Sequence, residues 1–159
     1  MSDFRVIDAP QIVQTEAQLA AMIHITVKRE EIRLVMGPGI QEVMGALAAQ
    51  GIAPTGPWFT HHLKMSPDIF DFEICVPVAT PVAAVGRVKP GELRAAKVAR
   101  TLYRGSYEGL GDAWKELSAW ITAQGHTTAP GLLERYIKGP ESGSDPSGWC
   151  TELNKVLVA

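Results

Sequence analysis

The sequence predicts an α+β fold made of a duplicated β-α-β-β module, with a mixed or antiparallel sheet and its helices on one face. Several segments alternate apolar and polar residues, as half-buried strands do, and two segments carry apolar residues at helical spacing and end at a glycine. The order of elements in the first half also recurs in the second half. We therefore expect a single domain over residues 1–159, with a first repeat at about 10–80 and a second at about 88–158.

The first repeat is predicted to hold one helix among three strands. The helix can begin at Pro38, because proline is favoured in a first helical turn, and Gly51 ends it. Strands are predicted at residues 12–28, 58–64 and 69–76, and residues 16–21 are also compatible with a helical turn.

The second repeat is predicted to follow a short apolar crossing at residues 76–86. Its elements are a strand at 93–104, a helix at 106–124, and strands at 132–138 and 149–158. Packing roles inside this repeat are expected for Tyr107, Trp114 and Trp120. The sheet face away from the helices is then free to line a groove.

Glu134 is the most informative residue of the second repeat, because it is an acid in an apolar strand. Side chains of a strand alternate between faces, so Glu134 and Tyr136 should point the same way. When the two repeats are aligned, Phe59 and His61 become their counterparts. The plainer alternative is that Glu134 is an exposed strand residue, since charged side chains are mostly exposed. Its partner would then be Arg135 or Lys138.

The composition is that of an ordinary globular protein. Hydrophobic residues make up 46% of the chain and charged residues 20%, which excludes a disordered chain. The net charge of −2, without a basic run, argues against direct nucleic-acid binding. We expect a cytoplasmic protein without a membrane segment, because no apolar leader and no apolar stretch of about 20 residues is present. The two cysteines, Cys75 and Cys150, are expected to be reduced thiols rather than a disulfide.

A cluster of histidines and acids raises the question of a metal site. His61 and His62 lie near three acids, Asp68, Asp71 and Glu73. Adjacent strand residues point to opposite faces, so the two histidines cannot easily share an ion, and neither HExxH nor CxxC is present. We expect neither a metal nor a cofactor.

An ordered set of motifs gives the chain a family resemblance. The segment 103–110 (YRGSYEGL) is followed by an amphipathic helix with Trp114, by Gly125, by the Glu-Arg-Tyr triplet 134–136 and by Thr-Glu-Leu at 151–153. This succession resembles the GyrI-like small-molecule-binding family, which includes effector-binding domains of bacterial transcription activators and stand-alone forms. The resemblance implies a ligand cleft between pseudo-symmetric halves, with the acid of the triplet in an aromatic-lined pocket for lipophilic, often cationic, ligands.

The sequence departs from the family pattern at two places. His61 stands where an aromatic residue is usual, and the final strand, residues 153–158, lacks the usual proline. The first departure concerns the chemistry of the cleft in the N-terminal half, and the second concerns only the geometry of a strand end.

The expected function is binding of a hydrophobic, aromatic or cationic small molecule by a carboxylate and stacking rings. The expected ligand-binding residues are Glu134, Tyr136, Phe59, Trp58, His61, Trp149 and Tyr103. One alternative that the resemblance implies is a hydrolase of strained, cyclopropanoid-type electrophiles, in which Glu134 and Tyr136 would be the catalytic residues. A further alternative is a gyrase-inhibitor-like modulator with a protein partner or a homodimer. No stretch is left over for a helix-turn-helix, so a role in transcription would need a partner.

Overall fold

The computed structural model describes residues 7–65, 68–139, 143, 145 and 148–158. The chain divides into two compact units. The N-terminal unit is residues 16–95, and the C-terminal unit combines the residues up to 15 with those from 96 onward. In each unit the described strands pair in antiparallel fashion and one α-helix packs against them, so the predicted α+β fold is confirmed.

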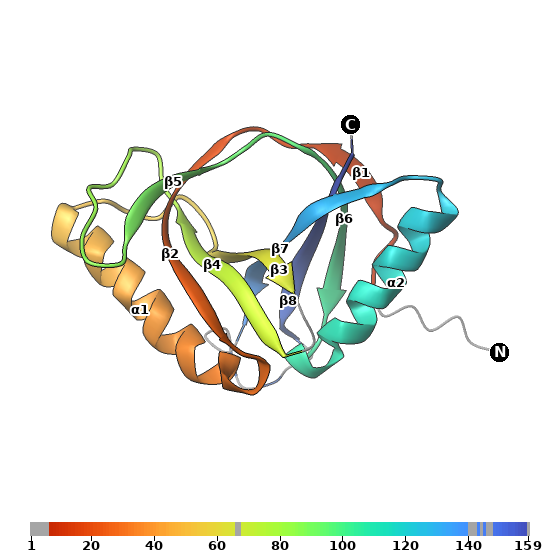
Figure 1. The fold of residues 1–159 in the computed structure, drawn as a ribbon, viewed down its shortest axis with the longest axis horizontal. Helices are drawn as coiled ribbons and strands as arrows, with labels where there is room; N and C mark the ends of the chain where they lie inside the picture. The colour runs from red at the N-terminus through yellow and green to blue at the C-terminus, as the bar shows by residue number, and fades with distance from the viewer. Residues whose placement is uncertain (1–6, 66–67, 140–142, 144, 146–147, 159) are drawn as a thin grey trace. The chain divides into compact units, whose positions relative to one another are not determined.

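The two units have the same architecture (Figure 1). The N-terminal unit contains β2 (Gln18–Lys28), the 3₁₀ turn η1 (Arg29–Glu31), α1 (Ile32–Gln50), β3 (Phe59–Met65), β4 (Ile69–Pro77) and β5 (Lys89–Leu93), with strand order β5-β2-β4-β3. The C-terminal unit contains β1 (Gln11–Gln14), β6 (Lys97–Arg104), the 3₁₀ turn η2 (Tyr107–Gly109), α2 (Leu110–Ala123), β7 (Thr128–Lys138) and β8 (Cys150–Leu157), with strand order β1-β6-β8-β7. The predicted duplication is therefore confirmed.

The edge strands are exchanged between the repeats, which the sequence did not predict. The segment predicted as one strand at residues 12–28 is two strands: β1 pairs with β6 of the C-terminal unit, whereas β2 belongs to the N-terminal unit. No helical turn separates them. Likewise the segment predicted as 93–104 contains the end of β5, which pairs with β2, and then β6.

Helix α1 begins before Pro38, so the predicted helix start was wrong. Proline cannot donate a hydrogen bond to the carbonyl of Leu34, and this normally favours a helix start. The turns before it are held by packing, because Ile32, Val35 and Met36 lie against the buried core. Tertiary packing has overridden the local preference.

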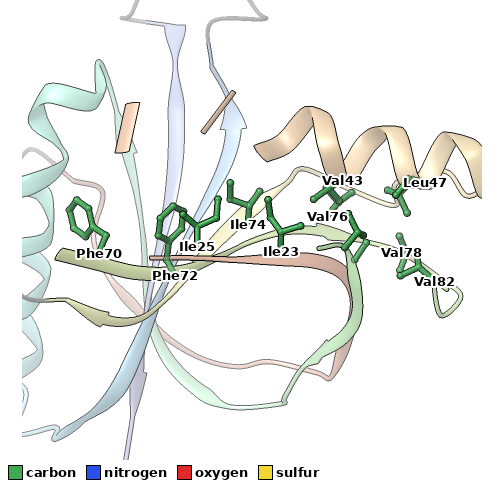
Figure 2. Close-up of a cluster of buried hydrophobic side chains, with 13 residues drawn as sticks. Ile23, Ile25, Val43, Leu47, Phe70, Phe72, Ile74, Val76, Val78 and Val82 are labelled. Atoms are coloured by element: carbon green, nitrogen blue, oxygen red, sulfur yellow. The ribbon is translucent and has the colours of Figure 1, made fainter. Parts of the chain in front are cut away.

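The core of the N-terminal unit lies between α1 and one face of its strands (Figure 2). Val43 and Leu47 of α1 meet side chains of β2 and β4 that are almost completely buried. In the C-terminal unit, Ala113, Leu117 and Ile121 of α2 pack against buried residues of β6 and β8. Both cysteines are buried free thiols, as expected. Neither described helix is long and apolar enough to cross a membrane.

His62 is a buried polar member of the N-terminal unit. Its ring stacks on Phe72 at 5.2 Å between centroids and meets the edge of Phe70 at 5.7 Å. Burial, together with the charge of the neighbouring His61, lowers the pKa of His62 to about 4. Its Nε2 lies 3.3 Å from Thr60 Oγ1, and Nδ1 has no hydrogen-bond partner among the described residues.

Gly39 and Gly45 provide a matched test of the packing of α1. A Cβ on Gly39 would lie 2.5 Å from Ile74 Cδ1, whereas a Cβ on Gly45 would meet nothing within 4 Å. Gly39→Ala should therefore lower the free energy of unfolding by about 1–3 kcal/mol through overpacking. Gly45→Ala should raise it by up to about 1 kcal/mol, because alanine is the better helix former. Urea denaturation measures both values, and a stabilising Gly39→Ala would contradict the close packing.

His62 predicts an acid-sensitive stability. Its pKa in the folded protein lies below the ordinary value of 6.5, so the unfolded chain takes up the proton first as the pH falls. The free energy of unfolding should fall between pH 6.5 and pH 4, by about 3 kcal/mol in total. His62→Phe keeps the ring and should flatten this slope, whereas His126→Gln in the other unit should preserve it. Denaturation curves across this pH range measure the free energy of unfolding. If its pH dependence is unchanged in His62→Phe, His62 is not the group responsible.

Candidate functional site

The carboxylate of Glu134 is held by two aromatic hydrogen-bond donors. Trp114 of α2 donates from Nε1 to Oε2 at 2.6 Å, and Tyr136 donates its hydroxyl to Oε1 at 2.8 Å. The predicted common face of Glu134 and Tyr136 is therefore confirmed. Tyr136 lies two residues along β7, and Trp114 is in the first half of α2, so the hydrogen bonds to Glu134 join the helix to this strand.

No cation accompanies this carboxylate, because none of the described residues forms an ion pair with Glu134. Desolvation by burial raises the pKa of Glu134, and the hydrogen bonds from Trp114 and Tyr136 lower it by less. Arg135 points to the other face of β7 and donates to Glu152 at 3.2 Å. Glu134 is half-buried and forms no ion pair with Arg135 or Lys138 among the described residues, so the alternative of an exposed Glu134 paired with either of them is wrong.

Further aromatic rings continue from Tyr136. Tyr107 of η2 meets Tyr136 edge to face with centroids 5.9 Å apart, and its other neighbour is Trp149 at 5.1 Å. Tyr107 is 37% exposed and Trp149 is half-buried, with its Nε1 donating to the carbonyl of Gly143. We call Glu134, Trp114, Tyr136, Tyr107 and Trp149 the carboxylate cluster; it combines one acid, two ring donors and exposed aromatic surface.

The sequence predicted three of these five residues and missed Trp114 and Tyr107, which it assigned to packing. Trp114 carried a usable signal, because a buried indole N–H normally needs an acceptor. Tyr107 carried none, since its position depends on the 3₁₀ turn before α2.

The carboxylate cluster lies on the helix-covered side of the C-terminal unit, because Trp114 belongs to α2. The carboxylate cluster therefore does not use the strand face away from the helix, which the sequence analysis considered free to line a groove. The opposite face carries a different polar network, in which Arg135 and Asn154 both donate to Glu152 Oε1. The physical reason is the register of β7, which turns Glu134 toward α2 and Arg135 away from it.

The predicted counterparts in the first repeat are displaced by one residue. On β3, Phe59 is opposite Cys75 and His61 is opposite Glu73, and these residues lie on the face away from α1. Phe59 is fully buried, and His61 Nδ1 lies 3.3 Å from Glu73 Oε1. His62 lies on the α1 side, so the predicted opposite orientation of the two histidines is confirmed.

On the face of β3 toward α1, the pair that corresponds to Glu134 and Tyr136 in orientation is Thr60 and His62. In β3 the side chains of this pair interact, as they do in β7. The residues opposite them on the neighbouring strand are also alike: Thr60 is opposite Ile74 of β4, and Glu134 is opposite Leu153 of β8. Trp58 packs on the same side, against the N-terminal core.

Tyr103 and Thr151 lie in one row with Tyr136 across β6, β8 and β7. Tyr103 is buried, and its hydroxyl donates to the carbonyl of Ser106 at 2.6 Å, which makes it a packing residue below the start of α2. Thr151 Oγ1 is buried without a partner among the described residues. The described residues contain no group of three or more His, Cys, Asp or Glu side chains arranged to hold a metal ion.

Comparisons with known proteins agree with this fold. The model of the GyrI-like small molecule binding domain matches residues 8–153. No curated protein matches the sequence.

Three solved structures illustrate the likeness. The EcmrR C-terminal domain is 20% identical with a TM-score of 0.85, and the match covers 97% of this chain and 99% of that one. EcmrR in its DNA complex is 21% identical with a TM-score of 0.83; the match covers 96% of this chain and 57% of the EcmrR chain, so this chain spans little more than half of that length. SAV2435 bound to tetraphenylphosphonium is 15% identical with a TM-score of 0.70, covering 96% and 95% of the two chains.

At these identities the structural matches establish the fold alone. The family model, in contrast, covers most of the sequence. The chain belongs to the GyrI-like small-molecule-binding domain family.

Proposed function

We propose that the carboxylate cluster binds a lipophilic organic cation, with Glu134 as its counter-charge. The observation that supports this most is a carboxylate whose hydrogen-bond donors, among the described residues, are both aromatic and which no described cation accompanies. Burying an unpaired charge is costly, and a ligand cation would supply the missing partner.

The aromatic part of the cluster suits the same ligand. Cations are attracted to the faces of Trp and Tyr rings, with about 0.5–2 kcal/mol per contact. The exposed edge of the cluster at Tyr107, next to the half-buried Trp149, offers a surface that a ligand could reach before it meets Tyr136 and Glu134. SAV2435, a protein of the same fold, has been solved with tetraphenylphosphonium, which makes this cation a sensible probe.

A pair of ions of similar size and opposite charge tests the proposal. Tetraphenylphosphonium should bind at pH 8, and tetraphenylborate should bind at least about tenfold more weakly because it meets the carboxylate with the wrong sign. Glu134→Gln should lower the affinity for tetraphenylphosphonium by about tenfold or more and leave the affinity for tetraphenylborate little changed. Isothermal titration calorimetry measures each dissociation constant.

The pH dependence follows from the raised pKa of Glu134. Lowering the pH protonates the carboxyl group, so cation affinity should fall with decreasing pH in the wild type and stay flat in Glu134→Gln. Glu108→Gln, a change to an exposed acid beside Tyr107, serves as the control and should behave as the wild type. Equal affinity for both ions, or an unaltered affinity in Glu134→Gln, would refute the proposal.

Hydrolysis of strained electrophiles is a second candidate, which the raised pKa of Glu134 favours. A carboxyl group of this kind can act as general acid or base near neutral pH, and Tyr136 is within hydrogen-bond distance of it. The candidate predicts that a cyclopropane-containing electrophile is converted to its water adduct, at a rate at least about 100-fold lower in Glu134→Gln. Chromatography of the reaction mixture measures the product, and a rate equal to that of Glu134→Gln would exclude this chemistry.

A further inference from the structure

A polar recess, separate from the carboxylate cluster, lies in the N-terminal unit on the face of the strands away from α1. It is a cavity of about 460 Å³ lined by Met22, His24, Glu73, Gly86, Arg87, Lys89 and Pro90. This volume is within the range of small-molecule sites, about 300–1,000 Å³. None of its lining residues belongs to the carboxylate cluster.

The recess exists because β5 covers only part of β2. Lys89, the first residue of β5, is opposite Met22, and β2 then continues to Lys28 with β4 as its described partner. The side chain of Met22 lies over Gly91, where an added Cβ would be 2.4 Å from its sulfur. Glycine at this position therefore lets Met22 form an apolar floor beside the strand.

Two opposite charges face this recess without neutralising each other. Glu73 receives a contact from His61 at Oε1, and the described residues give its other oxygen no partner. Lys89 forms neither a hydrogen bond nor an ion pair among the described residues, although it lines the same cavity as Glu73.

The other polar residues of the recess are already engaged. Arg87 donates to both carboxylate oxygens of Glu42, at 3.1 and 2.8 Å. His24 contacts Asp71, which also accepts from Thr26. Among the described residues, the groups without a partner in this recess are thus one carboxylate oxygen of Glu73 and the ammonium of Lys89, above an apolar floor.

We propose that this recess binds a small zwitterion, an amino acid or a molecule of similar size. The cationic group of the ligand pairs with Glu73 and its anionic group pairs with Lys89. A zwitterion satisfies both charges at once, whereas a simple anion or cation satisfies one and is repelled by the other. The site is independent of the proposed cation site at Glu134.

Ligands that differ only in charge test this proposal. The probes are ω-amino acids from glycine to 6-aminohexanoate, which scan the separation of the charges, together with butyrate and butylammonium. We expect one chain length to bind best, at least about tenfold more tightly than either singly charged probe. Amide chemical shifts of Gly86 and Gly91 report binding by NMR titration at low salt, where charge pairing is least screened.

Matched variants locate the binding. Glu73→Gln and Lys89→Gln should each weaken the best zwitterion about tenfold, while Lys28→Gln and Glu92→Gln, at residues outside the recess, should not. Glu134→Gln should keep zwitterion binding, which separates this result from the cation proposal. Absence of saturable shifts, equal affinity for butyrate or butylammonium, or unchanged affinity in both recess variants would overturn the proposal.

Discussion

The central interaction of the C-terminal unit is the pair of hydrogen bonds that Trp114 and Tyr136 donate to the carboxylate of Glu134. Glu134 is half-buried, and the indole of Trp114 and the phenol of Tyr136 donate to its two carboxylate oxygens in place of lost solvent. Such hydrogen bonds stabilise the charge only in part, because burial still raises the pKa. The same contacts link α2 to β7 and position the rings of Trp114 and Tyr136 around the carboxylate.

The two repeats use one fold position for different chemistry. In the C-terminal unit the helix-facing pair of the third strand is an acid and a phenol, Glu134 and Tyr136. In the N-terminal unit the equivalent pair is Thr60 and His62, and burial favours the uncharged form of that histidine. The two repeats thus share a polar side-chain contact within the strand, but only the pair in the C-terminal unit contains a carboxylate. On the strand face away from α1, the N-terminal unit places Glu73 and Lys89 in one recess without an ion pair between them.

The features that the sequence predicted correctly are those that depend on the local periodicity of apolar residues. Strand alternation placed Glu134 and Tyr136 on one face, and the repeated order of elements predicted the duplicated α+β fold. Pairing across the chain is not local: nothing in residues 11–14 indicates that they join β6 rather than lead into β2. The alignment of repeats was one residue off at Phe59, and a slip of one residue moves a side chain to the other face. Trp114 was assigned to the core because helical spacing does not show where its N–H points.

The most direct measurement is a ¹³C NMR titration of the Glu134 carboxyl carbon, with and without saturating tetraphenylphosphonium. The free protein should show a pKa above the ordinary glutamate value of about 4.3. The bound cation should lower that pKa, because a positive charge close to the carboxylate favours its ionised form. A pKa at or below the ordinary value in the free protein, or one that the bound cation leaves unchanged, would contradict a buried carboxylate that its ligand neutralises.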